Sequence, residues 1–178
     1  MNSYEFTIIA SGLDPDADDF ADRFFEAGCE DATLSFQKGL ILLDFEREAR
    51  TFLSAVVSAI RDVRRAGATV EGVEPSSLVS LSDIAARAQL SRAATSLYAQ
   101  GKRAGGFPAP VARVTTESPL WDWAEVARWL FLRNQVDRLT VVRARVTKAI
   151  GLAMKREHRS AIARKIAQRL KDDKRATQ

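Results

Sequence analysis

Two short helices joined by a tight turn are predicted within residues 79–130, and this pair constrains the fold of the chain more than any other feature. Ser80 precedes the first helix, where a serine oxygen can accept a hydrogen bond from a free N–H group of the first turn. Val79 and Ile84 flank the start of this helix at the spacing of a hydrophobic staple. Ser91 can cap the second helix in the same way. The sequence therefore predicts a helix-turn-helix.

The second helix has one side suited to a small core and another side suited to contact with a partner. Its packed side is predicted to consist of Ala94, Thr95 and Tyr98. Its outward side is predicted to consist of Ser91, Arg92, Ala93, Ser96, Leu97 and Gln100. Small polar groups and an arginine allow a helix to enter the major groove of DNA and to reach base edges and phosphates. We therefore regard this helix as a candidate recognition helix.

A third helix is expected to close the core of this pair. Asp122 is followed three residues later by Glu125, which is the spacing of a capping box. Trp121 and Val126 can form a second hydrophobic staple. Val126, Trp129 and the following leucine are expected to complete the small core.

A glycine-rich and basic link, residues 100–106, follows the second helix. Its glycines allow a backbone to approach closely, and Lys102 and Arg103 can neutralise phosphate charge. The glycines do not have the spacing of a nucleotide-binding loop. This link is therefore expected to contact a nucleic-acid backbone rather than a nucleotide.

The residues from 79 to 130 also resemble a known family, the excisionase and AlpA-like phage regulators of the MerR-type winged-helix group. The residues that fit the pattern of that family are Ile84, Ala85, Ser91, Arg92, Tyr98, Phe107, Pro108, Pro110, Val126, Trp129 and Leu130. The resemblance covers about 52 of the 178 residues. The chain departs from the pattern at Gln89, where a glycine is usual, and at Thr95, where a larger aliphatic residue is usual. Gln89 would have to accept a left-handed or strained turn.

The resemblance implies sequence-directed binding of double-stranded DNA by a winged helix-turn-helix. It implies that the second helix lies in the major groove and that a hairpin, Phe107–Thr116, acts as a wing on the DNA backbone. The DNA-binding residues predicted on this basis are Ser91, Arg92, Ala93, Ser96, Gln100, Lys102, Arg103 and Arg113. No cofactor and no metal ion is expected to take part.

Charge is divided unequally along the chain. Residues 1–80 hold 7 Lys and Arg against 15 Asp and Glu, a net charge of −8, whereas residues 81–178 hold 20 against 8, a net charge of +12. Such a division is typical of a half that binds a polyanion joined to a half that does not.

The acidic half is predicted to be a ferredoxin-like domain, residues 1–76, with the order β-α-β-β-α-β. In that architecture four antiparallel strands are covered by two helices on one face. The expected strands are Tyr4–Ala10, Thr33–Phe36, Leu40–Phe45 and Thr69–Val73, and the expected helices run from near Pro15 to Gly28 and from Ala49 to Arg65. The whole chain is therefore expected to be of the α+β class.

The function of this first domain is left open by its residues. RNA-binding RRM domains share the topology, but Leu40 and Leu42 occupy the positions of their stacking aromatic residues, and the domain is acidic. A role in folding and association is favoured over a small-ligand sensor, and nothing in the residues selects a ligand.

After the winged helix-turn-helix, residues 77–130, the remaining residues, 131–178, are expected to be a basic helical region. A largely apolar stripe recurs along it at Leu132, Val136, Leu139, either Val142 or Arg143, Val146 and Ile150. Such a stripe must be covered by the first domain or by a second copy of the chain, and self-association to a homodimer is favoured. Gly151 is expected to break or kink the helix, and the basic tail can lie along DNA or remain solvated.

Several functional classes are made improbable by the composition. The single cysteine, Cys29, excludes an intramolecular disulfide and is expected to be a buried thiol; the single histidine, His158, is expected to be a solvated surface residue. The acidic run between Asp14 and Asp22 lacks the glycine and the terminal glutamate of a calcium loop. No enzymatic activity is expected. Without an apolar run of membrane-spanning length, a cytoplasmic, nucleoid-associated protein is expected.

Two functional hypotheses follow. The leading one is a sequence-specific, DNA-binding transcriptional regulator that acts as a dimer. The alternative is an antitoxin-like or adaptor protein whose acidic N-terminal domain binds a protein partner.

Overall fold

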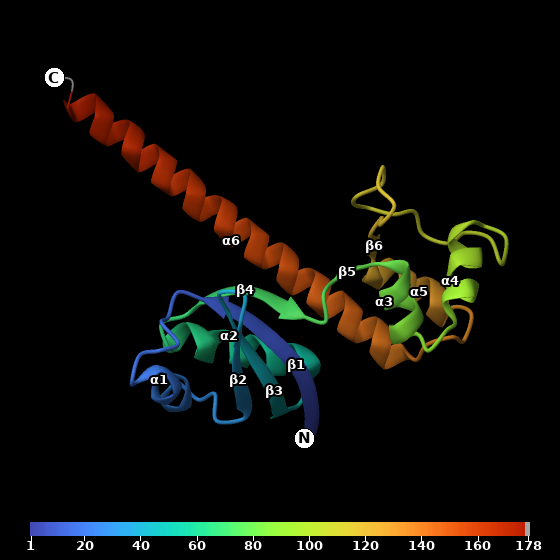
Figure 1. The fold of residues 1–178 in the computed structure, drawn as a ribbon, viewed down its shortest axis with the longest axis horizontal. Coiled ribbons are helices and arrows are strands. Elements are labelled where there is room, and N and C mark those ends of the chain that lie inside the picture. Colours follow the sequence, from blue (N-terminus) through green and yellow to red (C-terminus); the bar gives the residue numbers. More distant parts are fainter. Residues whose placement is uncertain (177–178) are drawn as a thin grey trace.

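The computed structural model describes residues 1–176, and it is a mixed α+β structure in which one long helix joins two packed modules (Figure 1). The elements of the first, the sheet module, are β1 (Asn2–Ser11), α1 (Phe20–Glu26), β2 (Ala32–Gln37), β3 (Leu40–Ala49), α2 (Phe52–Arg65) and β4 (Thr69–Glu74). The elements of the second, the helical module, are β5 (Leu78–Val79), α3 (Leu81–Arg87), α4 (Arg92–Ala99), β6 (Trp121–Asp122) and α5 (Trp123–Phe131). The long helix is α6 (Arg138–Ala176).

The sheet module is a four-stranded antiparallel sheet in the order β2-β3-β1-β4. Alternate residues of the central strands, among them Ile8 and Leu43, are fully buried and face the helices, because successive side chains of a strand point to opposite faces. Phe24 of α1 and Val56 of α2 pack onto the same core. A two-residue turn joins β2 to β3, with Lys38 at φ +54° and the next glycine at φ +80°, as short hairpins require.

Helix α1 begins later than the sequence predicts. The expected start was between Pro15 and Ala17, but residues 14–19 form turns and the helix runs over Phe20–Glu26. The side chain of Asp14 accepts a hydrogen bond from the backbone N–H of Asp16, at 3.0 Å. An Asp bonded to its own backbone two residues on stabilises a turn in competition with a helix, which accounts for the difference.

A buried arginine holds the sheet module together. Arg47 of β3 donates two hydrogen bonds to the carboxylate of Asp31, at 2.7 and 2.8 Å, and one to Asp62 of α2, at 2.7 Å. A further bond, at 2.7 Å, goes to the carbonyl of Gly28. Burial alone would lower the pKa of Arg47, but the bonds to the two carboxylates raise it above its ordinary value. The network links β3 to α2 and to the loop before β2.

The helical module has its own core. Val79, Ile84 and Val126 are fully buried, and the short strands β5 and β6 pair so that Val79 lies opposite Trp121. The predicted capping box at Asp122 is wrong in one respect. The Asp122 carboxylate accepts a hydrogen bond from the N–H of Ala124, but Glu125 does not return one; it lies 3.5 Å from the ammonium of Lys148 instead.

Helix α6 contributes side chains to both cores. Ile150 is buried in the core of the sheet module, with Val146 and Met154 packed against it, and Ala144 is buried in the core of the helical module. The expectation that a second copy of the chain covers this stripe is therefore wrong for Val146 and Ile150.

The predicted break at Gly151 is also wrong, because α6 is continuous from Arg138 to Ala176. Gly151 lies beside Ser77 in the segment that joins the modules: a Cβ atom built on it would be 4.0 Å from the Ser77 hydroxyl oxygen. Within residues 1–176, no helix combines the length and the apolar character that crossing a lipid bilayer requires.

Candidate nucleic-acid interface

Local hydrogen bonds that the sequence predicts cap the starts of α3 and α4. The Ser80 hydroxyl accepts from the N–H of Asp83 at 3.2 Å, and the Asp83 carboxylate accepts from the N–H of Ser80 at 2.8 Å, which completes a capping box. Ser91 caps α4 by accepting from the N–H of Ala94 at 3.1 Å. Gln89 adopts φ +53°, so the turn has the left-handed residue that the glycine of the family pattern would supply.

Helix α4 presents its two sides as the sequence predicts. Thr95 and Tyr98 are buried, and the hydroxyl of Thr95 donates to the carbonyl of Ser91 at 3.1 Å, which satisfies its polar group inside the core. Arg92, Ala93 and Leu97 are exposed. The remaining members of the predicted outward side are Ser91 and Gln100, which are exposed, and Ser96, which is half-buried and accepts a hydrogen bond from the Gln100 amide at 3.0 Å.

The basic link after α4 is anchored at both ends. The N–H groups of Lys102 and Arg103 donate to the carbonyl of Leu97, at 3.0 and 3.2 Å, and the Arg103 guanidinium lies 5.4 Å from the centroid of the Tyr98 ring. At the other end, the carbonyl of Gly105 accepts from the indole of Trp129 at 3.3 Å. Lys102 and Arg103 therefore stay exposed on a backbone that the core holds in place.

Arg133 is a positioning residue of this link that the sequence analysis missed. Its guanidinium lies 3.7 Å from the centroid of the Trp129 ring and donates to the Gly105 carbonyl at 2.9 Å. The spacing of Arg133 four residues after Trp129 is the signal that could have indicated the contact, because residues four apart lie on the same side of a helix.

The predicted wing is displaced along the chain. Phe107, its expected first residue, packs in the core between Tyr98 and Trp129, with ring centroids at 6.3 and 5.0 Å. The hairpin is closed instead by Ala112, which pairs with Leu120. The prolines at 108 and 110 have no N–H group to donate to a strand ladder, so pairing cannot begin where the hairpin was expected.

Arg113 is exposed in the loop that this hairpin encloses. It has φ +51°, and its carbonyl accepts from the N–H of Thr116 at 3.0 Å. Arg113 therefore lies in the loop of a hairpin, but the hairpin is closed by other residues than the sequence predicts.

Four exposed cations lie on α4 and on the loops that follow it: Arg92 is on α4, Lys102 and Arg103 are in the basic link, and Arg113 is in the hairpin loop. Among the side chains that the structure describes, none of these four forms an ion pair with a carboxylate. Two other cations, by contrast, bond to groups of the fold itself. Arg87 donates to the carbonyl of Ser76 at 2.8 Å and its pKa is lowered by burial, and Lys148 pairs with Asp122 at 2.6 Å.

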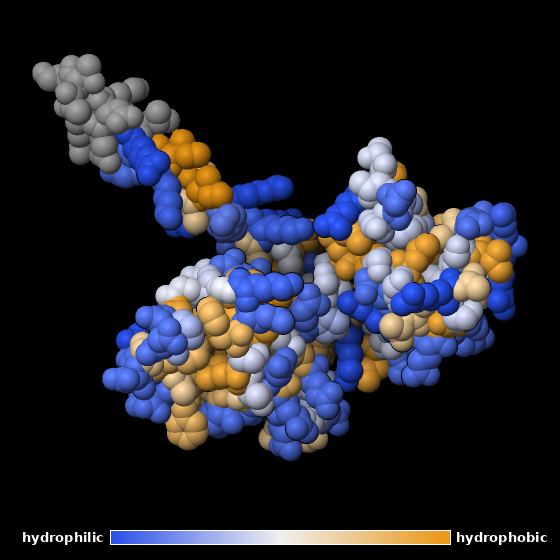
Figure 2. Space-filling view, in the orientation of Figure 1, coloured by the Kyte–Doolittle hydropathy of each residue, from blue (hydrophilic) through white to orange (hydrophobic). Residues whose placement is uncertain are grey.

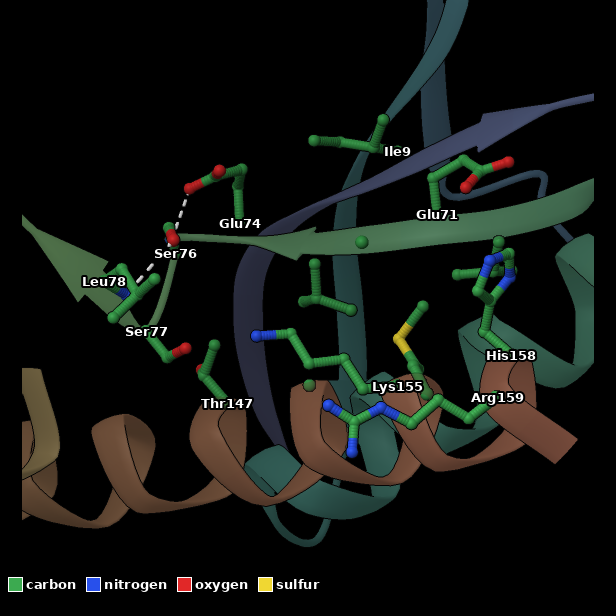
Figure 3. Close-up of a pocket in the computed structure, with 15 residues that line it drawn as sticks. Ile9, Glu71, Glu74, Ser76, Ser77, Leu78, Thr147, Lys155, His158 and Arg159 are labelled. Carbon is green, nitrogen blue, oxygen red and sulfur yellow. Dashed lines mark hydrogen bonds between the residues drawn. The ribbon is translucent and has the colours of Figure 1, made fainter. Parts of the chain in front are cut away.

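A cleft between β4 and α6, of about 460 Å³, is a separate candidate site (Figure 3). Lys155, His158 and Arg159 of α6 lie along one wall, and all three are exposed, as the sequence predicts for the histidine. Figure 3 shows Glu71 and Glu74 on the far side of β4, directed away from these cations. None of the predicted DNA-binding residues lines this cleft.

The apolar side of the distal part of α6 is also free. Ile162 and Ile166 are exposed, and Figure 2 shows apolar residues gathered beside hydrophilic ones on that part of the helix. The end of the basic tail lies outside the residues whose side chains are described; this end includes Lys171, Lys174 and Arg175.

Metal chemistry has no site in the described part of the chain. No group of three or more His, Cys, Asp and Glu side chains within residues 1–176 is placed to hold an ion. Cys29 is buried, and burial raises the pKa of its thiol to about 11, with the nearby Arg47 acting in the opposite direction.

Comparisons of the chain with protein-family models, curated proteins and solved structures give no match.

Proposed function

We propose that residues 77–131 are a winged helix-turn-helix that binds double-stranded DNA, in a protein that regulates transcription. The observation that supports this proposal is the exposed side of α4 together with four exposed cations, one on α4 and three on the loops that follow it, which form no ion pair among the described side chains. Cations of this kind release counterions when they meet phosphates, which is the main source of affinity for DNA.

In the proposed complex α4 enters the major groove with its first turn foremost. Arg92 is in that turn and is the residue proposed to reach base edges. The small residues Ala93 and Ser96 allow the helix to approach closely, with Ser91 and Gln100 at its two ends. Lys102, Arg103 and Arg113 are proposed to contact phosphates on either side of the groove.

We further propose that the sheet module is a ferredoxin-like association domain and that the protein binds DNA as more than one copy. The homodimer expected from the sequence remains part of this proposal for the DNA-bound state only, with one change. Val146 and Ile150 pack within the chain, so another surface must join the copies.

The test is selection of bound oligonucleotides by the full-length chain, followed by titration of the selected duplex with variants. Arg92→Ala should weaken binding and relax the sequence preference, because a good contact to a base is worth about 1 to 3 kcal/mol of discrimination. Lys102→Ala should weaken binding to all sequences equally and reduce the salt dependence.

Arg50→Ala is the matched control, since it removes one exposed positive charge from the sheet module. It should leave affinity and preference unchanged. If Arg92→Ala behaves like Arg50→Ala, the proposed docking of α4 is wrong.

The alternative function, binding of a protein partner by the acidic half, is favoured by one observation. The open face of the sheet carries Glu5 directly opposite Glu46, with Asp44 and Glu48 on the same strand face. Like charges opposite one another are destabilising, so this face suits a basic partner. Retention of a cellular protein by the full-length chain but not by a Glu5→Gln/Glu46→Gln variant would favour the alternative.

A further inference from the structure

A groove lies where the end of α5 meets the start of α6, and none of the residues proposed to bind DNA lines it. Its volume is about 290 Å³. The apolar residues that line it include Phe131, Leu132 and Val142, which are 39%, 68% and 44% exposed. Contiguous exposed apolar side chains of this kind mark an interaction site more often than an inert surface.

The groove is also strongly cationic. Arg128, Arg138 and Arg145 line it, and no acidic residue does. None of the three forms an ion pair within residues 1–176. An occupant that satisfies both properties must present an apolar side chain surrounded by carboxylates.

The sheet module carries one segment of that description, helix α1. Phe25 is 69% exposed, and Asp22 and Glu26 are exposed beside it. The charge of the neighbouring Arg23 is neutralised by Asp19 at 2.7 Å. The outer surface of α1 therefore presents Asp22 and Glu26 beside a protruding phenyl ring, while Arg65 of α2 lies next to Glu26 at the end of the helix.

The other exposed large apolar residues of the sheet module are less suitable. Leu53 and Val57 of α2 lie one turn apart, and the next turn brings Arg61 to the same side. Phe36 is close to Lys38 at the end of the hairpin. Both patches would bring positive charge toward the arginines of the groove.

We propose that copies of this chain associate head to tail, with Phe25 of one copy in the α5–α6 groove of the next. In this contact Asp22 and Glu26 face Arg128, Arg138 and Arg145. Figure 1 shows α1 on the side of the sheet module that is turned away from the α5–α6 junction, so one chain cannot satisfy its own groove. The proposal does not depend on DNA binding.

A two-fold symmetric contact through the groove is disfavoured by the same charges. It would place the arginines of one copy against the arginines of the other, and like charges across an interface oppose association. In the head-to-tail contact every copy has one donor, α1, and one acceptor, the groove. Such contacts extend into open chains or close into rings.

The test is the molecular mass of the full-length protein in solution as a function of concentration. We expect the mass of the natural chain to rise beyond that of a dimer, and to fall again as added salt screens the ion pairs. Phe25→Ser, which removes the donor, and Val142→Glu, which blocks the acceptor, should each be monomeric. Leu53→Ser is the matched control, since it removes an exposed apolar residue outside the contact.

Mixing the two monomeric variants distinguishes the proposed geometry from any other. Each variant keeps the half that the other lacks, so an equimolar mixture should form dimers and should stop there. A charge exchange provides the second check: Asp22→Arg should weaken association, and its mixture with Arg145→Glu should regain it.

Three results would overturn the proposal. The first is a natural chain that stays monomeric at the highest soluble concentration. The second is an oligomer that persists in Phe25→Ser, including one that depends on Ile162 and Ile166. The third is a mixture of Phe25→Ser and Val142→Glu that remains monomeric although each variant is folded by circular dichroism.

Discussion

The guanidinium of Arg133 stacks on the indole of Trp129, with 3.7 Å between its central carbon and the ring centroid. Both side chains donate to the same acceptor, the carbonyl of Gly105. The loop that carries Lys102 and Arg103 is thus fixed by a residue that follows α5 and lies about thirty positions further along the chain. This arrangement places two exposed cations without using their own side chains for support.

Replacement of Arg133 should release this loop. Arg133→Ala removes a cation–π contact and a charge-assisted hydrogen bond, and we expect a loss of about 1 to 2 kcal/mol in the free energy of unfolding. Arg133→Lys keeps the charge but loses the planar stacking. If the residue acts by positioning, both variants should speed hydrogen exchange at the amides of residues 102–105. Unchanged exchange in both would contradict the role assigned to Arg133.

Loss of the buried arginine should be far more damaging to the sheet module. Arg47→Met leaves the carboxylate of Asp62, which is 8% exposed, without its closest partner. Breaking a buried pair costs about 3 kcal/mol or more in the free energy of unfolding, measured by urea titration. The exposed pair of Arg23 and Asp19 supplies the control: Arg23→Ala should change stability by less than about 0.5 kcal/mol.

The turn between α3 and α4 should be improved by a glycine. Gln89 adopts φ +53°, a conformation that costs a residue with a side chain about 1 kcal/mol. We expect Gln89→Gly to raise the free energy of unfolding by about 0.5 to 1 kcal/mol, measured as a shift in the urea midpoint. Gln89→Ala retains the strain and should give no increase. Equal effects of the two variants would show that strain at this position is negligible.

The capping box of α3 should give a defined pH dependence. Hydrogen bonds from the Ser80 side chain and backbone lower the pKa of Asp83 below its ordinary value of 3.8. A carboxyl group with a lowered pKa in the folded state stabilises the protein above its ordinary pKa, and this contribution is lost as the pH falls through the folded pKa.

Ser80→Ala should cost about 1 kcal/mol at neutral pH, because it removes the cap and part of the support for the carboxylate. The difference in unfolding free energy between the natural chain and this variant should shrink as the pH is lowered below 3.8. Urea titrations of both proteins at several pH values would measure it, and a difference independent of pH would contradict the assignment.

The thiol of Cys29 should be unreactive in the folded protein. Burial raises its pKa to about 11, so very little thiolate is present at neutral pH, and the thiolate is the reactive species. Labelling with a disulfide reagent should proceed at the rate of unfolding, and addition of urea should accelerate it. Rapid labelling of the folded chain would show that the side chain is accessible.

The parts of the fold that could be predicted from the sequence are those decided by neighbouring residues. The caps at Ser80 and Ser91 fix where α3 and α4 begin, since the hydrogen bonds involved span three residues. A left-handed residue at Gln89 could be expected because the pattern that the sequence resembles has a glycine at this position. The outward side of α4 followed from helical periodicity.

The remaining features depend on contacts between distant residues. The hairpin is closed at Ala112 and not at Phe107, because Phe107 packs in the aromatic cluster of the core, and no local pattern reveals which ring fills that space. The apolar stripe of α6 was visible in the sequence, but its partner was not, because periodicity identifies a face and not what covers it. Arg47 follows Leu43 and Phe45 at every second position of β3, so its side chain points to the same buried face of the sheet. This alternation is a sequence signal for a buried cation.

Because α6 supplies Ile150 to one core and Ala144 to the other, neither module can release this helix without exposing apolar surface of its own core. Melting should therefore be a single cooperative transition for the whole protein. Because α6 is continuous, a sideways displacement of the helix where it contacts β4 should rotate the helical module at its other end. A molecule that binds the sheet module can in this way change the orientation of α4.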